Sequence, residues 1–340
     1  MIAMSEKKLI LPQGYKSPLG VIETEVAIKL IKDTFERELA EVLHLTRVSA
    51  PLFVRPSSGL NDNLNGVERP VQFDMKDLAE EVQIVQSLAK WKRLALHRYG
   101  FAPGEGLYTD MNAIRRDESL DNLHSAYVDQ WDWEMIITQE QQTMEFLREI
   151  VEKIVSALWA TQQNLCAQFS ATKPFLTRDL TWITTQELED MYPSLTPYER
   201  ECEITREKGT VFLAQIGGKL KSGIPHDGRA PDYDNWSLNG DILIWNPLLN
   251  RVFEISSMGI RVDAQALERQ LELAGCPERR ELEFHRMLLE GALPLTVGGG
   301  LGQSRICMLL LQTAHIGEVQ ASEWPPEMTA ACAEHGIRLL

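Results

Sequence analysis

The spacing of apolar positions predicts a set of long amphipathic helices. Within residues 24–44, apolar side chains recur every three or four positions with charges between them, as one face of a helix requires. A second stripe of this kind runs through residues 81–98, and the strongest occupies residues 143–169. Thr184 and Glu187 have the spacing of a capping box, which predicts a further helix beginning there.

Shorter apolar runs between these helices predict strands. Residues 47–54 contain Pro51, which cannot donate to a ladder, so this strand is expected at an edge or an interface. The other expected strands span residues 107–115, 125–135, 211–216, 241–245 and 252–257. The last two form a hairpin across the Asn-Pro turn at 246–250.

The strands follow one another as hairpins instead of alternating with helices at βαβ intervals. This order favours an α+β fold, an antiparallel β-sheet flanked by helices. No Pro/Gly/Ser-rich linker divides the chain, so residues 1–340 are interpreted as a single domain.

Composition narrows the possible partners. The formal charge is 34 − 49 = −15, and so acidic a chain repels nucleic-acid backbones. Five scattered cysteines without a CxxC pair are typical of reduced thiols in a cytoplasmic protein. The first 20 residues lack a long apolar run, and no stretch of 18 apolar residues exists, so neither a secretory leader nor a membrane span is expected.

The segment TVGGGLGQSR, residues 296–305, is a candidate nucleotide site. Glycines permit close approach of the backbone to a ligand, and a helix N-terminus favours an anion. Arg305, near the start of the expected helix, adds a fork of donors for phosphate or carboxylate. The segment has neither the GK[ST] of a Walker A loop nor the βαβ setting of a Rossmann fingerprint. A plain glycine-rich turn is the alternative.

Two groups of carboxylates are candidate ligands. Asp241 and Glu254 lie on the two strands of the expected hairpin, where a shared face would bring them together unless a cation such as Mg²⁺ lay between them. The alternative places them as solvated acids on opposite faces. Asp129, Asp132 and Glu134 alternate with tryptophans and would suit an α-amino group, or they form a solvated strand face.

Further polar residues each allow two interpretations. Asp232 and Asp234 follow Pro231, so they either contact an amino group or make an Asx turn. Lys92, in SLAKWK, is either a carboxylate ligand or a solvated charge on the surface of a helix.

The order of these segments resembles the three motifs of class II aminoacyl-tRNA synthetases. More closely, the chain resembles the ammonia-dependent asparagine synthetases (aspartate–ammonia ligases) over essentially its whole length, in SLAKWKR, GEGLYT, HSAYVDQWDWE, GGKL, RAPDYD, LNGDIL, EISSMGIRVD and GGGLGQSR. The resemblance implies a class II synthetase-like catalytic domain that uses ATP, L-aspartate, ammonia and Mg²⁺. It also implies that β-aspartyl-adenylate forms first, and that ammonia then displaces AMP to give asparagine.

The resemblance also implies a role for each matching residue. Arg115 would contact the α-phosphate and the reacting carboxylate, Arg305 would hold the nucleotide, and Asp62 would lie beside the ammonia site. Substrate-binding roles fall on Ser87, Lys92, Gln130, Asp132, Asp234 and Ser257. Nucleotide-binding roles fall on Arg115, Asp241, Glu254, Gly299, Gly300 and Arg305, with Asp241 and Glu254 holding the metal.

Two departures from the family pattern leave questions open. The loop between the RRDE cluster and His124 is one residue short, so counting from its two ends selects either Arg115 or Arg116 as the motif arginine. We expect Arg115 to be the motif arginine. The segment RAPDYD also runs almost directly into LNGD, which predicts a short lid.

Two other classes of protein were considered for this chain, and the resemblance also implies an oligomeric state. A tRNA-charging enzyme is disfavoured because few residues precede the first expected helix and the chain is acidic. A non-catalytic, synthetase-like binding module would require loss of an essential group, yet Arg115, Asp241, Glu254 and Arg305 are all present. The Pro51 segment matches the twofold interface of class II synthetases, so a homodimer is expected.

Overall fold

The computed structural model describes residues 9–62, 64 and 68–340. Residues 1–8, which contribute to the expectation that no secretory leader is present, lie outside the described residues. So do residues 63 and 65–67, which follow Asp62 in the GLNDNLNG segment. Within the described ranges, no helix is long and apolar enough to span a bilayer.

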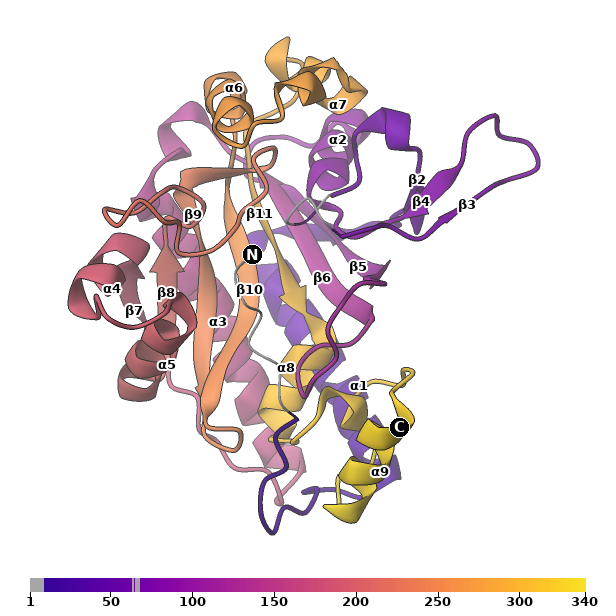
Figure 1. The fold of residues 1–340 in the computed structure, drawn as a ribbon, viewed down its shortest axis with the longest axis vertical. Coiled ribbons are helices and arrows are strands. Elements are labelled where there is room, and N and C mark those ends of the chain that lie inside the picture. The colour runs from indigo at the N-terminus through magenta and orange to yellow at the C-terminus, as the bar shows by residue number, and fades with distance from the viewer. Residues whose placement is uncertain (1–8, 63, 65–67) are drawn as a thin grey trace.

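A large mixed sheet forms the centre of the molecule, and every pairing between its inner strands is antiparallel (Figure 1). Only the terminal pairs β1–β5 and β7–β8 are parallel. The α+β prediction is therefore confirmed. In spatial order, the strands are β1 (Leu45–Arg47), β5 (Gly106–Ile114), β6 (Tyr127–Ile136), β11 (Thr296–Gly302), β10 (Arg251–Arg261), β9 (Asp234–Asn246), β8 (Thr210–Ala214) and β7 (Thr181–Thr184).

Three helices cover one face of this sheet: α1 (Val21–Leu43), α3 (Met144–Gln168) and α8 (Gln303–Leu311) (Figure 1). The largest apolar core lies between them and the sheet. Phe35 of α1 packs against Trp131 of β6 with ring centroids 4.9 Å apart. Burial of the apolar stripes on these helices is what holds them to the sheet.

The opposite face of the sheet is only partly covered. Helix α2 (Ala89–Tyr99) packs against β5, β6 and β11, while α5 (Pro197–Lys208) packs against β8, β9 and β10. The centre of this face stays open between them, and that is where a site can form. The remaining α-helices of the described residues are α4 (Thr185–Met191), α6 (Ala264–Leu273), α7 (Glu283–Leu289) and α9 (Pro326–Glu334).

Local patterns located several elements correctly. Thr143 caps α3 by accepting from the Phe146 N–H at 3.1 Å, so the helix predicted at 143–169 is confirmed. The capping box at Thr184 and Glu187 starts α4 as predicted. The predicted hairpin is β9 and β10, with Trp245 opposite Val252 beside the turn.

Two elements in the N-terminal half of the chain differ from their predicted bounds. Residues 82–84 form strand β4 of a small second sheet with β2 (Phe53–Val54) and β3 (Gln72–Phe73), so the helix expected at 81–98 begins only at Ala89. The strand expected at 47–54 is two strands in different sheets, β1 and β2, with Pro51 between them; the expected edge position is confirmed, because each lies at the edge of its sheet. Pro51 has no N–H to donate, so neither ladder continues through it.

Candidate active site

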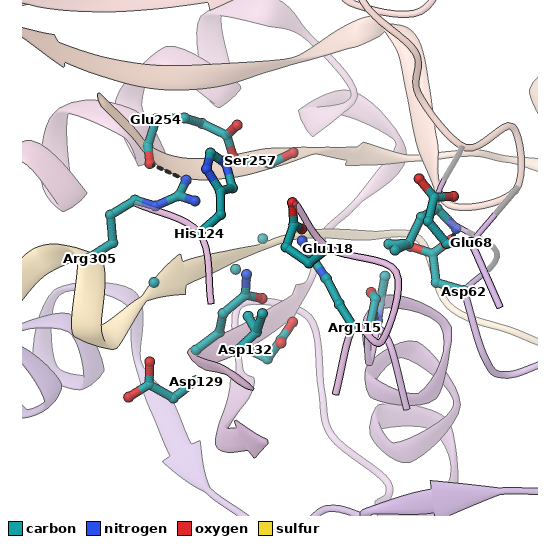
Figure 2. Close-up of a pocket in the computed structure, with 18 of the residues that line it drawn as sticks. Asp62, Glu68, Arg115, Glu118, His124, Asp129, Asp132, Glu254, Ser257 and Arg305 are labelled. Atoms are coloured by element: carbon teal, nitrogen blue, oxygen red, sulfur yellow. Dashed lines mark hydrogen bonds between the residues drawn. The ribbon is translucent and has the colours of Figure 1, made fainter. Parts of the chain in front are cut away.

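A cavity of about 470 Å³ opens on the uncovered face of the central sheet, over β6, β11 and β10. Among the residues to which the resemblance gave a role, Asp241 alone does not line it. Figure 2 shows Glu254, Ser257, His124 and Arg305 toward one side, and Asp62 and Glu68 toward the other, with Arg115 and Glu118 between. The predicted residues that line the cavity are Asp62, Ser87, Lys92, Arg115, Gln130, Asp132, Asp234, Glu254, Ser257, Gly299, Gly300 and Arg305.

The glycine run forms the floor of the cavity. It is strand β11, paired with β6 on one side and β10 on the other, so the interpretation as a plain turn was wrong. A Cβ added to Gly300 would lie 2.5 Å from Gln130 Oε1. A Cβ added to Gly299 would lie 2.6 Å from the Cβ of Met258. Side chains on the neighbouring strands therefore exclude larger residues at both positions, and on the cavity side the floor stays open at Gly300.

Strand β6 separates its residues between the two faces of the sheet. Trp131 and Trp133 are 0% exposed and belong to the core beneath the helices. Asp132 is buried on the cavity side, so the interpretation of these acids as a solvated face was wrong. Asp129 accepts from the Lys32 ammonium at 3.0 Å and from the Ser304 hydroxyl at 2.8 Å, which ties α1 and α8 to the strand.

Lys92 is only 1% exposed, so the interpretation as a solvated charge was wrong. Its ammonium donates to Asp132 Oδ1 and, at 2.9 Å, to the Gly299 carbonyl. Burial lowers the pKa of Lys92, and the nearby carboxylate of Asp132 opposes that shift. Asp132 Oδ2 is buried and has no hydrogen-bond partner among the described residues. The pair therefore presents a cation and an open acceptor side by side at the cavity.

Asp234 belongs to a buried network centred on Arg261. Arg261 donates to Asp234 Oδ1 and, at 2.7 Å, to Glu134 Oε2. Glu134 Oε1 also accepts from the Thr296 hydroxyl at 2.7 Å. Asp234 lines the cavity and is paired with this arginine, whereas Glu134 is fully buried in the network and does not line the cavity.

At the other side of the cavity, Arg305 donates to the Glu254 carbonyl at 2.8 Å, as Figure 2 shows. Asp241 is paired with Arg229, which donates to Asp241 Oδ1 at 2.6 Å and to the Ser257 hydroxyl. Burial raises the pKa of Asp241 to about 7, and repulsion from Glu254 adds to the rise against the pull of Arg229. Asp241 is thus no solvated acid, whereas the Glu254 side chain is exposed.

The loop after β5 brings charged groups over the cavity. Arg115 lines it and has a buried Nε without a hydrogen-bond partner in the described part of the chain. Arg116 is exposed and does not line it. His124 is held by Asp121, whose Oδ1 lies 2.7 Å from the imidazole Nδ1. Opposing the effect of burial, His124 holds the pKa of Asp121 well below its usual range.

Asp62 is 3% exposed and lies at the far side of the cavity from Arg305 (Figure 2). Its Oδ1 accepts from the Leu64 N–H at 3.0 Å. Burial raises its pKa, and Lys90 opposes the rise. Asp232, expected to contact an amino group or make an Asx turn, instead accepts from Lys90 at 3.1 Å outside the cavity lining.

No role was predicted for Arg229, Arg261, Asp121 or His124. Arg229 lies in RAPDYD and Arg261 in SSMGIRVD, so both are in quoted segments, but nothing local identifies the acids that they contact. Arg261 and Glu134 are 127 positions apart in sequence. For Arg261, the sequence offered one signal of a buried partner: a charged residue within a strand that is otherwise apolar.

The fold is that of class II aminoacyl-tRNA synthetase catalytic domains. The asparaginyl-tRNA synthetase of Entamoeba histolytica, solved with asparaginyl-adenylate, superposes with a TM-score of 0.64 at 16% identity, covering 88% of this chain and 66% of that one. The Pyrococcus horikoshii asparaginyl-tRNA synthetase with asparaginyl-adenylate gives 0.63 at 17% identity, covering 89% and 70%. At these identities the likeness concerns the fold alone.

The chain belongs to the aspartate–ammonia ligase family. The family model described by that name matches residues 22–336. The aspartate–ammonia ligase of Ruminiclostridium cellulolyticum is 60% identical over 333 residues, covering 98% of this chain and 99% of the relative. That of Clostridium perfringens strain 13 is 61% identical over 335 residues, covering 98% and 100%. The relative from Lactobacillus johnsonii is 58% identical over 334 residues, covering 98% and 99%.

Proposed function

We propose that this chain makes L-asparagine from L-aspartate, ammonia and ATP, with AMP and diphosphate as the other products. The observation that carries the proposal is the Lys92–Asp132 pair in the same cavity as Arg115 and Arg305. A cation beside an open carboxylate oxygen matches the two charged groups at the α-carbon of an amino acid. The two arginines match a triphosphate.

Aspartate would bind at the end of the cavity that holds Lys92. The Lys92 ammonium, with Ser87 and Gln130 beside it, would orient the α-carboxylate, while Asp132 Oδ2 and Asp234 would accept from the α-ammonium. This arrangement would hold the amino acid by its α-carboxylate and its α-ammonium. The side-chain carboxylate of aspartate would then point toward Arg115. Holding the reactants in this way removes much of the entropic barrier to their reaction.

The first chemical step joins the aspartate side chain to the nucleotide. A carboxylate oxygen attacks the α-phosphorus, the bond from that phosphorus to the bridging oxygen breaks, and diphosphate leaves. Arg115 would neutralise charge on the α-phosphate, and Arg305 would hold the nucleotide over Gly299 and Gly300. The mixed anhydride divides one difficult amide synthesis into two easier steps.

The second step forms the amide. Nitrogen attacks the acyl carbon, the bond from that carbon to the phosphate oxygen breaks, and AMP leaves. Ammonium has no lone pair, so it must lose a proton before it attacks. Asp62, a buried carboxylate at the cavity, would bind the ammonium and accept that proton.

Mg²⁺ would be held by the carboxylates of Asp241 and Glu254 at the nucleotide side. Burial raises the pKa of Asp241 to about 7, repulsion from Glu254 adds to the rise, and a divalent cation would relieve this repulsion. Among the described residues no three acids, histidines or cysteines converge on one point, so substrate phosphates would complete the coordination. When bound, the ion would neutralise phosphate charge.

The products test the proposal. Purified protein supplied with ATP, Mg²⁺, aspartate and ammonium should yield asparagine, AMP and diphosphate in equal amounts, because the nucleotide is cleaved between its α- and β-phosphates. Chromatography of the nucleotides together with amino-acid analysis would measure this. Omission of Mg²⁺ with a chelator present serves as the control. Formation of ADP and phosphate, or no asparagine, would contradict the proposal.

The assembly is proposed as a homodimer acting in the cytoplasm. The segment around Pro51 corresponds to the twofold interface of class II synthetases, and an isologous dimer is the commonest closed assembly. The five cysteines are all free thiols, which suits a reducing compartment. The net charge of −15 does not favour tRNA as a partner.

Sedimentation should therefore give about twice the chain mass of 38.6 kDa at micromolar protein. Replacement of the exposed Leu52, next to Pro51, by Glu should shift the protein toward monomer, because a buried charge opposes the contact. A matched Leu273→Glu change on α6, also exposed, should leave the mass unchanged. A wild-type monomer would disprove the dimer.

A further inference from the structure

Arg229 holds two residues at the nucleotide side of the cavity at once. Its Nη2 donates to Asp241 Oδ1 at 2.6 Å, and its Nη1 donates to the Ser257 hydroxyl. The side chains of Arg229 and Asp241 are only 10% and 11% exposed. Arg229 and Ser257 line the cavity, whereas Asp241 does not. Of the paired arginine and carboxylate, only the arginine therefore reaches the cavity.

The two carboxylates proposed to hold the metal share one face of the β9–β10 hairpin. Asp241 is directly opposite Ser257 in this ladder, and opposite residues of an antiparallel pair point to the same face. The register shifts between Glu254 and Ser256, and Glu254 lines the cavity together with Ser257 (Figure 2). Carboxylate oxygens grouped in this way fit a hard divalent cation.

One arginine does not balance the charge of this face. When both are ionised, Asp241 and Glu254 carry two negative charges against the single positive charge of Arg229. Glu254 accepts from Arg305 through its backbone carbonyl, and its carboxylate makes no ion pair among the described residues. A divalent cation in place of the guanidinium would balance both carboxylates. Arginine stays charged at any working pH, so it competes for Asp241 under all assay conditions.

The Arg229 side chain is held at its tip. Its Nε is buried and has no hydrogen-bond partner in the described part of the chain. The residue before it is the exposed Gly228, in the loop that leads into β9. The two side-chain hydrogen bonds therefore hold the guanidinium, and a rotation of the side chain toward the cavity would break both.

We propose that Arg229 is an exchangeable counter-ion of Asp241, which a divalent cation must displace before Asp241 can act as its ligand. The inference rests on the proposed function, because that proposal makes Asp241 a metal ligand. The same displacement frees the Ser257 hydroxyl for substrate. Because the competing cation belongs to the chain, it lowers the apparent affinity for the metal without preventing binding.

Binding of Mn²⁺ in the absence of nucleotide and aspartate tests the exchange. Mn²⁺ takes the same oxygen ligands as Mg²⁺, and electron paramagnetic resonance measures the free ion. Arg229→Gln should bind Mn²⁺ about tenfold more tightly than the wild type, roughly the contribution of one hydrogen bond between charged groups. Arg229→Lys keeps a competing charge and should stay near the wild type. Ser257→Ala removes only the second acceptor of Arg229, so a smaller gain is expected.

Three controls separate competition from effects of net charge or folding. Arg148→Gln removes the same charge from an exposed position on α3, across the sheet, and should leave the Mn²⁺ affinity unchanged. In an Asp241→Asn background, Arg229→Gln should give no gain, because the carboxylate for which the two cations compete is gone. With a chelator, Arg229→Gln should unfold at a lower temperature than the wild type, and Mn²⁺ should raise its Tm more.

The outcomes distinguish the two proposals. Mn²⁺ binding by Arg229→Gln that is equal to or weaker than that of the wild type would overturn the exchange and make Arg229 a fixed structural partner. A gain that persists in the Asp241→Asn background would overturn it too. If Arg229→Gln does not fold, unchanged or weaker binding by Ser257→Ala contradicts the exchange. The binding measurement involves no turnover, so a wild type that makes no asparagine and AMP refutes the proposed function separately.

Discussion

Arg115→Ala is expected to lower aspartate-dependent pyrophosphate exchange by about 10²–10³-fold, the loss typical of removing one donor to a developing charge. Arg115 lines the cavity, and its buried Nε has no partner among the described residues, so a donor stands ready for the α-phosphate. The exchange reaction measures adenylate formation without the ammonia step. Arg115→Lys should recover only part of the rate, because an ammonium cannot donate as a planar fork.

Arg116→Ala is the matched control for this prediction. Arg116 is the next residue, is exposed and lies away from the cavity, so its loss should leave the exchange near the wild-type rate. The comparison also decides the register left open by the shortened loop. A large loss in Arg116→Ala with little change in Arg115→Ala would show that the other register is correct.

Elements defined by neighbouring residues were predictable from the sequence. The caps at Thr143 and Thr184 depend on residues three positions away, and the β9–β10 hairpin depends on one turn. The helix expected at 81–98 failed because residues 82–84 take their hydrogen bonds from β2 and β3. Pairing with distant strands overrode a local periodicity that suited a helix.

The site could be predicted only in part, because its contacts join distant positions. Nothing near Lys92 identifies Asp132, 40 residues away, as the carboxylate that pairs with it. The glycine run read locally as a turn, since glycine is unfavourable inside strands. Glycine is needed in this strand because the side chains of Gln130 and Met258 on the adjacent strands leave no room for a Cβ. The resemblance assigned the site roles to Lys92, Asp132, Gly299 and Gly300, whereas the local pattern alone left the bland interpretations open.

Asp62→Asn should separate the two halves of the reaction. Asparagine formation should fall by about 10²-fold or more, the usual contribution of a positioned base, while aspartate-dependent pyrophosphate exchange continues. The amide of Asn can occupy the same buried space and can still accept from the Leu64 N–H, but it can neither balance an ammonium charge nor take its proton.

The pH dependence of this variant gives a second, independent measure. In the wild type, the pKa of Asp62 is raised by burial, so its proton-accepting form is lost progressively as pH falls through that raised value. Asparagine formation should therefore decline on the acidic side before exchange does. Asp62→Asn should remove this difference, because no titrating group remains at that position. Equal loss of exchange and asparagine formation in the variant would instead assign Asp62 to adenylate formation or to folding.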